Sequence, residues 1–299
     1  MNINKVLVPV DFCPASTLAV NCGVALARKL RARLSLLHVV ESPSLLYRFA
    51  HEVEKLATQR KEQAEQMLPV LIGSEDQDDL DVHFIVRTGE IGEVIESVVH
   101  EERADLIVMG THGRSLFGRL FLGSVTQALI RKLGIPVLTV GRVFRPLEFK
   151  RVLFATDFGP DSDNGFRFAL DLARATGCSL LVAHTIEKRL PVTNVTQQAR
   201  QHTQEQFAKL RTEADLRKVP IECVAAEGEA SESLLRIANE YDVDFMILGL
   251  RKKGAMEYVL PLLGATAEPV IRSAHVPVLS IPIGAKVSES IEIFGNQLT

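Results

Sequence analysis

VLVPVDF at residues 6–12 returns as VLFATDF at residues 152–158, and this pair decides the fold. Three more matched runs follow in the same order: LLHVVE with VAHTIE, DLIVMG with DFMILG, and IPVLTV with VPVLSI. Four matched runs in one order indicate an internal duplication, and a repeat of this length is a domain rather than a solenoid unit. We therefore expect two domains, residues 1–145 and 146–299, joined by a short link near Pro146.

Within each copy, short runs rich in Val, Ile and Leu alternate with longer helical patterns. The runs are nearly continuous in apolar residues, as expected of parallel strands covered by helices on both faces. In the first copy they are residues 6–10, 34–40, 82–86, 106–109 and 137–140. This order predicts the α/β class, with two tandem, doubly wound, Rossmann-like sheets of five parallel strands. Ligands of such sheets bind beyond the carboxyl ends of the strands.

Composition and charge limit the classes of partner and the cellular compartment that we expect. The net charge is −3 and Lys and Arg form no blocks, whereas binding to a nucleic-acid backbone needs clustered cations. No apolar run approaches the roughly 20 residues of a membrane span, and the first residues lack a signal-peptide pattern. We expect a cytoplasmic protein with neither nucleic acid nor membrane as partner. Cys13, Cys22, Cys178 and Cys223 form no CxxC pair and are expected to be buried free thiols.

One stretch carries recognisable chemistry: MGTHGRSLFGRLFLGS at residues 109–124. Gly110 and Gly113 follow a strand, where glycine lets the backbone approach a ligand closely. Gly123 and Ser124 open a helix, whose free N–H groups and positive dipole end attract phosphate. The stretch lacks the Lys and Ser/Thr of a Walker loop, and no GxGxxG follows the first strand. Neither a P-loop NTPase nor an NAD enzyme is therefore favoured.

The G-x2-G-x9-G-[ST] spacing, the VPVDF and LHVVE strands and the final GIPVLTV resemble the universal stress protein family, across both copies. The resemblance implies a tandem member that binds ATP in its first copy, with Mg²⁺ held by the phosphates. It also implies a stress-response regulator, commonly dimeric through the last strand, with weak or no hydrolysis. The implied contacts to adenine, ribose and phosphates come from Pro9, Val10, Asp11, Val39, Met109, Gly110, Gly113, Gly123, Ser124 and Val125.

The second copy departs from this spacing. Four residues separate Gly249 from Gly254 where the first copy has two between its glycines, and Ala265 stands where the first copy has Ser124. We expect a degenerate phosphate site there. The RKK run at residues 251–253 is interpreted as a solvated turn, with an anion site as the alternative. The ligand of this copy is left open.

Several functions remain compatible with the sequence. The leading hypothesis is a non-catalytic, ATP-responsive regulator, because no catalytic or metal-ligating constellation is recognisable. A slow ATPase or nucleotide-transferring enzyme would need Asp11 or His112 as its base. An interaction module with both sites inactive is the third hypothesis. We also expect the last strands, 137–140 and 278–281, to pair edge to edge as a pseudo-dimer, and two chains could associate further.

Overall fold

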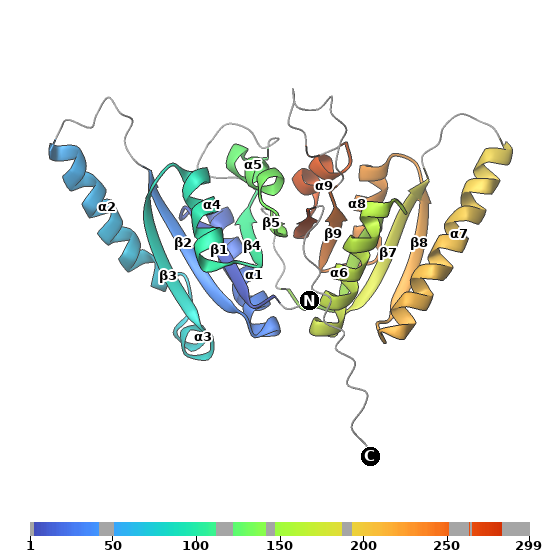
Figure 1. The fold of residues 1–299 in the computed structure, drawn as a ribbon, viewed down its shortest axis with the longest axis horizontal. Coiled ribbons are helices and arrows are strands. Elements are labelled where there is room, and N and C mark those ends of the chain that lie inside the picture. The colour runs from blue at the N-terminus through green and yellow to red at the C-terminus, as the bar shows by residue number, and fades with distance from the viewer. Residues whose placement is uncertain are drawn as a thin grey trace, which may run out of the picture.

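The computed structural model describes residues 3–41, 51–111, 122–141, 147–186, 193–250, 263 and 265–282. Strands and helices alternate through both copies (Figure 1), as the apolar runs predict. The expected boundary between residues 145 and 146 falls in the segment 142–146, outside the described residues.

The first copy contains five strands and five helices in its described part. They are β1 (Lys5–Val10), α1 (Pro14–Leu30), β2 (Arg33–Glu41), α2 (His51–Val70), α3 (Ser74–Asp79), β3 (Val82–Gly89), α4 (Ile91–Glu102), β4 (Leu106–Gly110), α5 (Ser124–Lys132) and β5 (Val137–Val140). The short α3 follows the long, charged α2 before β3 begins.

The second copy repeats this order without a counterpart of α3, since residues 217–220 lead directly from helix to strand. Its described elements are β6 (Arg151–Thr156), α6 (Pro160–Thr176), β7 (Ser179–Ile186), α7 (Thr193–Leu216), β8 (Ile221–Glu227), α8 (Ala230–Glu240), β9 (Phe245–Gly249), α9 (Ala267–Ser273) and β10 (Val278–Ile281).

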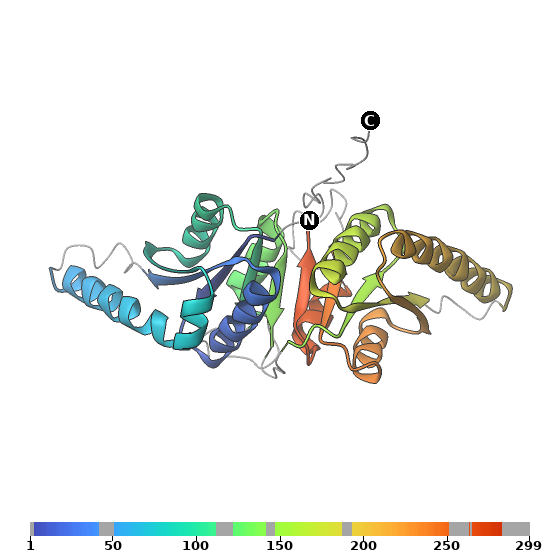
Figure 2. The same cartoon turned by 90° about the horizontal axis from the view of Figure 1, so that it is seen from below.

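All strands join one sheet, in the order β3-β2-β1-β4-β5-β10-β9-β6-β7-β8. Strands within each copy are parallel, and the copies meet where β5 pairs antiparallel with β10, Leu138 opposite Leu279. The predicted pairing of the last strands is thus confirmed. The two halves flank this central join, with helices on both faces of the sheet (Figure 2).

The core consists of two apolar layers, one on each face of the sheet. One lies beneath α1, α2, α6 and α7 and includes Val8, Leu138, Phe154 and Leu279. The other lies beneath α4, α5, α8 and α9 and includes Leu7, Met109 and Met246. Both layers contain residues of both copies, so the hydrophobic effect holds the halves together as well as each half internally.

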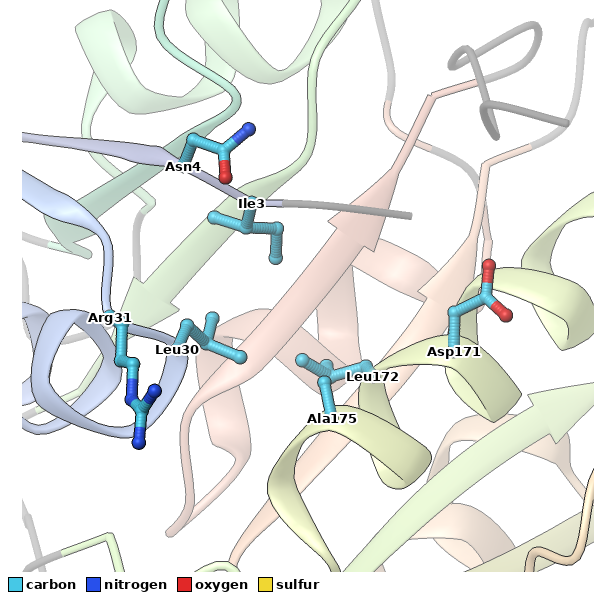
Figure 3. Close-up of a pocket in the computed structure, with 7 residues that line it drawn as sticks. All are labelled: Ile3, Asn4, Leu30, Arg31, Asp171, Leu172 and Ala175. Atoms are coloured by element: carbon cyan, nitrogen blue, oxygen red, sulfur yellow. The ribbon is translucent and has the colours of Figure 1, made fainter. Parts of the chain in front are cut away.

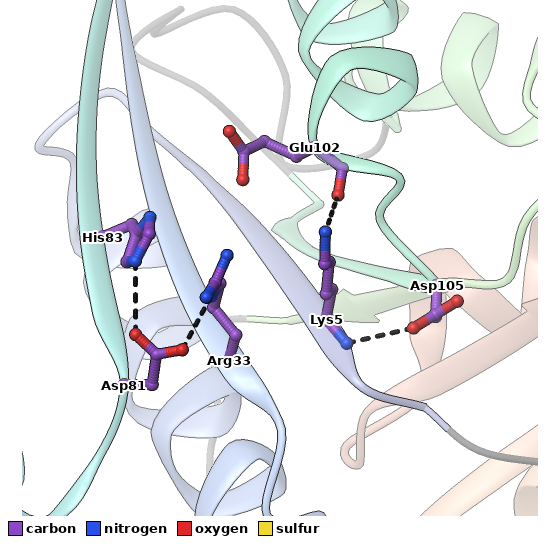
Figure 4. A network of polar contacts seen from close by, with 6 residues as sticks. All are labelled: Lys5, Arg33, Asp81, His83, Glu102 and Asp105. Atoms are coloured by element: carbon purple, nitrogen blue, oxygen red, sulfur yellow. Dashed lines mark hydrogen bonds and ion pairs between the residues drawn. The ribbon is translucent and has the colours of Figure 1, made fainter.

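An aspartate at the amino end of the fourth strand of each copy ties that strand to the first. Oδ2 of Asp105 accepts hydrogen bonds from the backbone N–H groups of Asn4, at 2.8 Å, and Lys5, at 3.0 Å (Figure 4). Asp244 does the same for Lys150, at 2.6 Å, and Arg151, at 2.8 Å. This explains the aspartate in the repeated DLIVMG and DFMILG runs. It satisfies two backbone donors that precede the sheet ladder.

Two expectations from composition can be compared with the structure. Cys22 and Cys178 are buried, but Cys13 and Cys223 are only partly buried, so the cysteine prediction is half right. Among the described helices, none combines the length and the apolar character that crossing a bilayer requires.

Candidate functional site

The candidate residues of the first copy gather at one edge of the sheet. This edge is formed by the carboxyl ends of β1, β2 and β4, which pair side by side, and by the start of α5. The residues placed there are Pro9 and Val10 in β1, Asp11 directly after it, Val39 in β2, Met109 and Gly110 in β4, Gly123 before α5, and Ser124 and Val125 in its first turn. Gly113 and His112 lie in the segment 112–121, outside the described residues.

The corner between β4 and α5 is closed by two hydrogen bonds. The N–H of Gly123 donates to the carbonyl of Thr111 at 2.8 Å, and Oγ1 of Thr126 donates to the carbonyl of Gly110 at 3.1 Å. Gly123 occupies the N-cap position and has no side chain of its own to cap the first N–H groups of α5. Uncapped donors at a helix start, together with the helix dipole, form a site suited to an anion.

Gly110 is required by packing at this edge. A Cβ added to it would lie 2.9 Å from Cβ of Ala15 and 3.2 Å from that residue's carbonyl oxygen. Ala15 belongs to the first turn of α1 and is itself buried. The missing side chain therefore lets α1 and the end of β4 approach each other at the same edge.

The turn from β1 to α1 places Asp11 just before the residue that caps the helix. Its Oδ1 accepts from the N–H of Cys13 at 3.1 Å, and Cys13 is the N-cap, with Sγ accepting from the N–H of Ser16 at 3.4 Å. Phe12 between them has a φ of 61°, a left-handed conformation uncommon for an aromatic residue. This turn places the helix start beyond the acid, so Cys13 rather than Asp11 caps α1.

The thiol of Cys13 is not activated by this arrangement. Partial burial, followed by its hydrogen bond to Asp11, raises the pKa of Cys13 above the usual value. A raised pKa favours the thiol over the reactive thiolate. The surroundings of Cys13 therefore give no support to a reactive thiolate.

The apolar candidates do not all face the same way. Val39 and Val125 pack against the core layer that contains Met109. Val10 is 4% exposed and belongs to the layer on the opposite face. Because successive strand residues alternate, Pro9 faces the side of Val39. The structure thus brings Pro9, Val39, Met109 and Val125 to one face and leaves the side chain of Val10 behind the sheet.

His38 supports this edge from behind. Its Nδ1 lies 2.7 Å from the carbonyl oxygen of Val10, and its ring stacks on Phe12 with centroids 4.6 Å apart. The second copy repeats both contacts: His184 reaches the carbonyl of Thr156 at 2.8 Å and packs on Phe158 at 4.3 Å. Both histidines are therefore partly buried and hydrogen-bonded to the strand beside them.

The same corner of the second copy is built more loosely. A Cβ added to Gly249 would meet no described atom within 4 Å. Helix α9 has only seven residues, no side-chain cap, and Ala265 and Ala267 where the first copy has Ser124 and Thr126. Residues 251–262, which contain the RKK run, lie outside the described part of the chain. Asp157 keeps its place, accepting from the N–H of Gly159 at 2.8 Å and from the hydroxyl of Ser162.

Sequence reasoning missed Thr126. The signal was present, because GSVT at residues 123–126 aligns with GATA at residues 264–267, so both hydroxyl positions differ between the copies. Only the serine was noticed, since it belongs to the recognised spacing. The threonine acts through a hydrogen bond to the preceding strand, which the one-dimensional pattern does not display.

A cavity of about 280 Å³ lies at the opposite edge of the sheet, between the copies (Figure 3). Leu30 and Leu172 face each other across it, while Arg31 and Asp171 extend away from the gap. Asp171 is paired with Arg217 at 2.7 Å. This seam lies near the amino ends of the strands, whereas ligands of such sheets bind beyond the carboxyl ends, so we do not take it as the ligand site. Among the described residues, no group of three or more His, Cys, Asp or Glu side chains is placed to hold a metal ion.

Comparisons with known proteins agree with this architecture. A model of the universal stress protein family matches residues 2–141 and again residues 148–282. A universal stress protein of Methanocaldococcus jannaschii is 27% identical over 153 residues, covering 46% of this chain and 94% of that protein. One from Mycobacterium tuberculosis is 25% identical over 186 residues, covering 59% of this chain and 61% of that protein. A universal stress protein structure from Archaeoglobus fulgidus shares the fold, with a TM-score of 0.68 and 23% identity over 95% of this chain and 97% of that one.

Proposed function

The chain belongs to the universal stress protein family, as a tandem member with two family domains, and from this premise we propose that its first copy binds ATP. The second copy, in this proposal, has lost the ability to bind a triphosphate. The protein acts as a regulator of the stress response that responds to bound ATP and does not need to hydrolyse it.

The observation that carries the proposal is the corner between β4 and α5. Gly123 leaves the first N–H groups of α5 without a side-chain cap, and Ser124, which follows it, is exposed and adds a hydroxyl. The α5 helix starts where β4 ends, held by the N–H of Gly123 on the carbonyl of Thr111. Such a helix start favours a phosphate by its dipole and by direct hydrogen bonds.

The remaining contacts follow from the same edge. Gly110 and Gly113 would let ribose and phosphates approach the backbone, and Pro9, Val39 and Met109 would provide the apolar side toward adenine. Asp11 would receive a ribose hydroxyl in addition to its bond from Cys13, since a carboxylate accepts several hydrogen bonds. Mg²⁺ would be held chiefly by the phosphate oxygens, because a hard cation prefers oxygen ligands and keeps several waters.

Thermal unfolding with and without MgATP tests the proposal. A ligand at a hundredfold excess over its Kd adds about 2.7 kcal/mol to the free energy of unfolding. We expect the wild type to gain this protection and Gly123→Val to lose it. The variant should fold, because a Cβ at this position meets its nearest neighbour, the carbonyl oxygen of Thr111, at an ordinary 3.4 Å.

Gly264→Val is the matched control, since it makes the same change at the equivalent position of the second copy. It should keep the full protection by ATP. Absence of protection in the wild type would refute the proposal. Loss of protection in Gly264→Val but not in Gly123→Val would show that ATP binds to the second copy. That result would refute the assignment of the site to the first copy.

A further inference from the structure

The hydroxyl of Thr126 joins the first turn of α5 to the end of β4. Thr126 is the third residue of α5 and is 4% exposed, so its side chain is turned inward. Oγ1 donates to the carbonyl of Gly110 at 3.1 Å. The N–H of Thr111, the next residue, in turn donates to the carbonyl of Val140 in β5 at 3.0 Å. The start of α5 is thereby fixed to two neighbouring strands.

This fixation matters because the attraction of a helix start for an anion is short-ranged. The favourable field falls off within the first turn, and the hydrogen bonds to a phosphate need defined donor positions. Without the hydroxyl of Thr126, the first turn of α5 would lose a hydrogen bond to the end of β4 and keep the bond from the N–H of Gly123 to Thr111. The donors would then be free to shift relative to the strand ends that hold the rest of the ligand.

We propose that Thr126 is a positioning residue for the triphosphate, which holds the start of α5 in register with β4 and does not itself contact the ligand. The inference rests on the proposed binding of ATP by the first copy. It assigns the selectivity for phosphorylated over unphosphorylated ligand to a buried hydroxyl outside the glycine pattern.

The second copy provides an internal comparison. Ala267 stands at the position of Thr126, and an alanine side chain cannot donate to the preceding strand. Its N-cap, Thr266, has φ −98° and ψ −45° and makes no capping hydrogen bond. The copy without Ser124 is therefore also the copy without the bond to its fourth strand. If Ser124 and Thr126 both serve to hold phosphate, a copy that no longer binds phosphate is expected to lack both hydroxyls, as the second copy does.

Isothermal titration calorimetry with two probes tests the inference. MgATP reports on the whole site, and adenosine reports on the base and ribose subsite without phosphates. We expect Thr126→Val to weaken ATP about tenfold and to leave adenosine within about twofold of the wild type. Thr126→Ser, which keeps the hydroxyl, should bind both probes as the wild type does. Should Thr126→Val not fold, Thr126→Ala removes the same hydroxyl with a smaller side chain.

Thr203→Val is the control for removing a buried hydroxyl as such. Thr203 is 2% exposed and donates to the carbonyl of Ala199 at 2.8 Å within α7. It should affect neither probe. Unchanged ATP affinity in Thr126→Val, or an equal loss of ATP and adenosine, would overturn the positioning role while leaving ATP binding intact. A wild type that binds neither probe would instead overturn the proposed function and this inference with it.

Discussion

Substitution of Gly110 by alanine should destabilise the protein, whereas the same substitution at Gly249 should not. The added Cβ at Gly110 would lie 2.9 Å from Cβ of Ala15 and 3.1 Å from its carbonyl carbon. Carbon atoms attract best at about 3.5–4.0 Å, so the first turn of α1 would have to move by several tenths of an ångström. Overpacking of this kind costs about 1–3 kcal/mol.

Thermal unfolding followed by circular dichroism measures this cost. For a chain of this size each kcal/mol lowers Tm by about 2–4 °C. Gly249→Ala is the matched control, because no described atom lies within 4 Å of the new Cβ and the residue is exposed. It should stay within about 0.5 kcal/mol of the wild type, as most surface changes do. Equal Tm values for the two variants would show that the close approach of α1 to β4 is not real.

Three further outcomes are expected from contacts elsewhere in the molecule. Asp244→Ala removes the acceptor of two backbone N–H groups and should cost about 2 kcal/mol in urea unfolding; a cost below about 0.5 kcal/mol would contradict the tie between strands. Burial lowers the pKa of His184 below its usual 6.5, so the stabilisation that the neutral ring provides is present above that pH and lost as pH falls through the lowered value. His184→Asn should therefore show a flatter decline of the urea midpoint below pH 6.5 than the wild type. Parallel declines in the two proteins would contradict the lowered pKa of His184. The buried hydroxyl of Ser280 has no hydrogen-bond partner among the described residues, whereas that of Thr139 donates to a carbonyl across the join at 3.0 Å. Ser280→Ala should be neutral or stabilising and Thr139→Val should cost about 1 kcal/mol, and the reverse order of stabilities would refute this assignment.

The sequence was sufficient for the architecture because repetition and apolar runs are local signals. The matched VLVPVDF and VLFATDF runs predict two similar halves, and the continuous apolar runs predict parallel strands covered on both faces. The pairing of β5 with β10 could also be predicted from the sequence. An edge strand presents unpaired backbone groups, and two edge strands of similar sequence can satisfy each other by pairing.

The site was predicted less completely, and the reasons are physical. Cys13 caps α1 after a turn in which Phe12 adopts a left-handed conformation, which its residue type alone argues against. The side chains of Pro9 and Val10 lie on opposite faces of the sheet, as strand alternation requires. The role of Thr126 depends on a contact with Gly110 across a long loop, and only comparison of the two copies hints at it.

The antiparallel join of β5 and β10 has an evolutionary consequence. When two identical chains meet at such a join, every mutation appears on both sides of it. Here one polypeptide supplies both sides, so either half can change while the other keeps its ligand. The tether also makes the pairing intramolecular, and dilution does not separate the partners. A duplicated gene of this kind can therefore retain one half as a sensor and release the other for a different task.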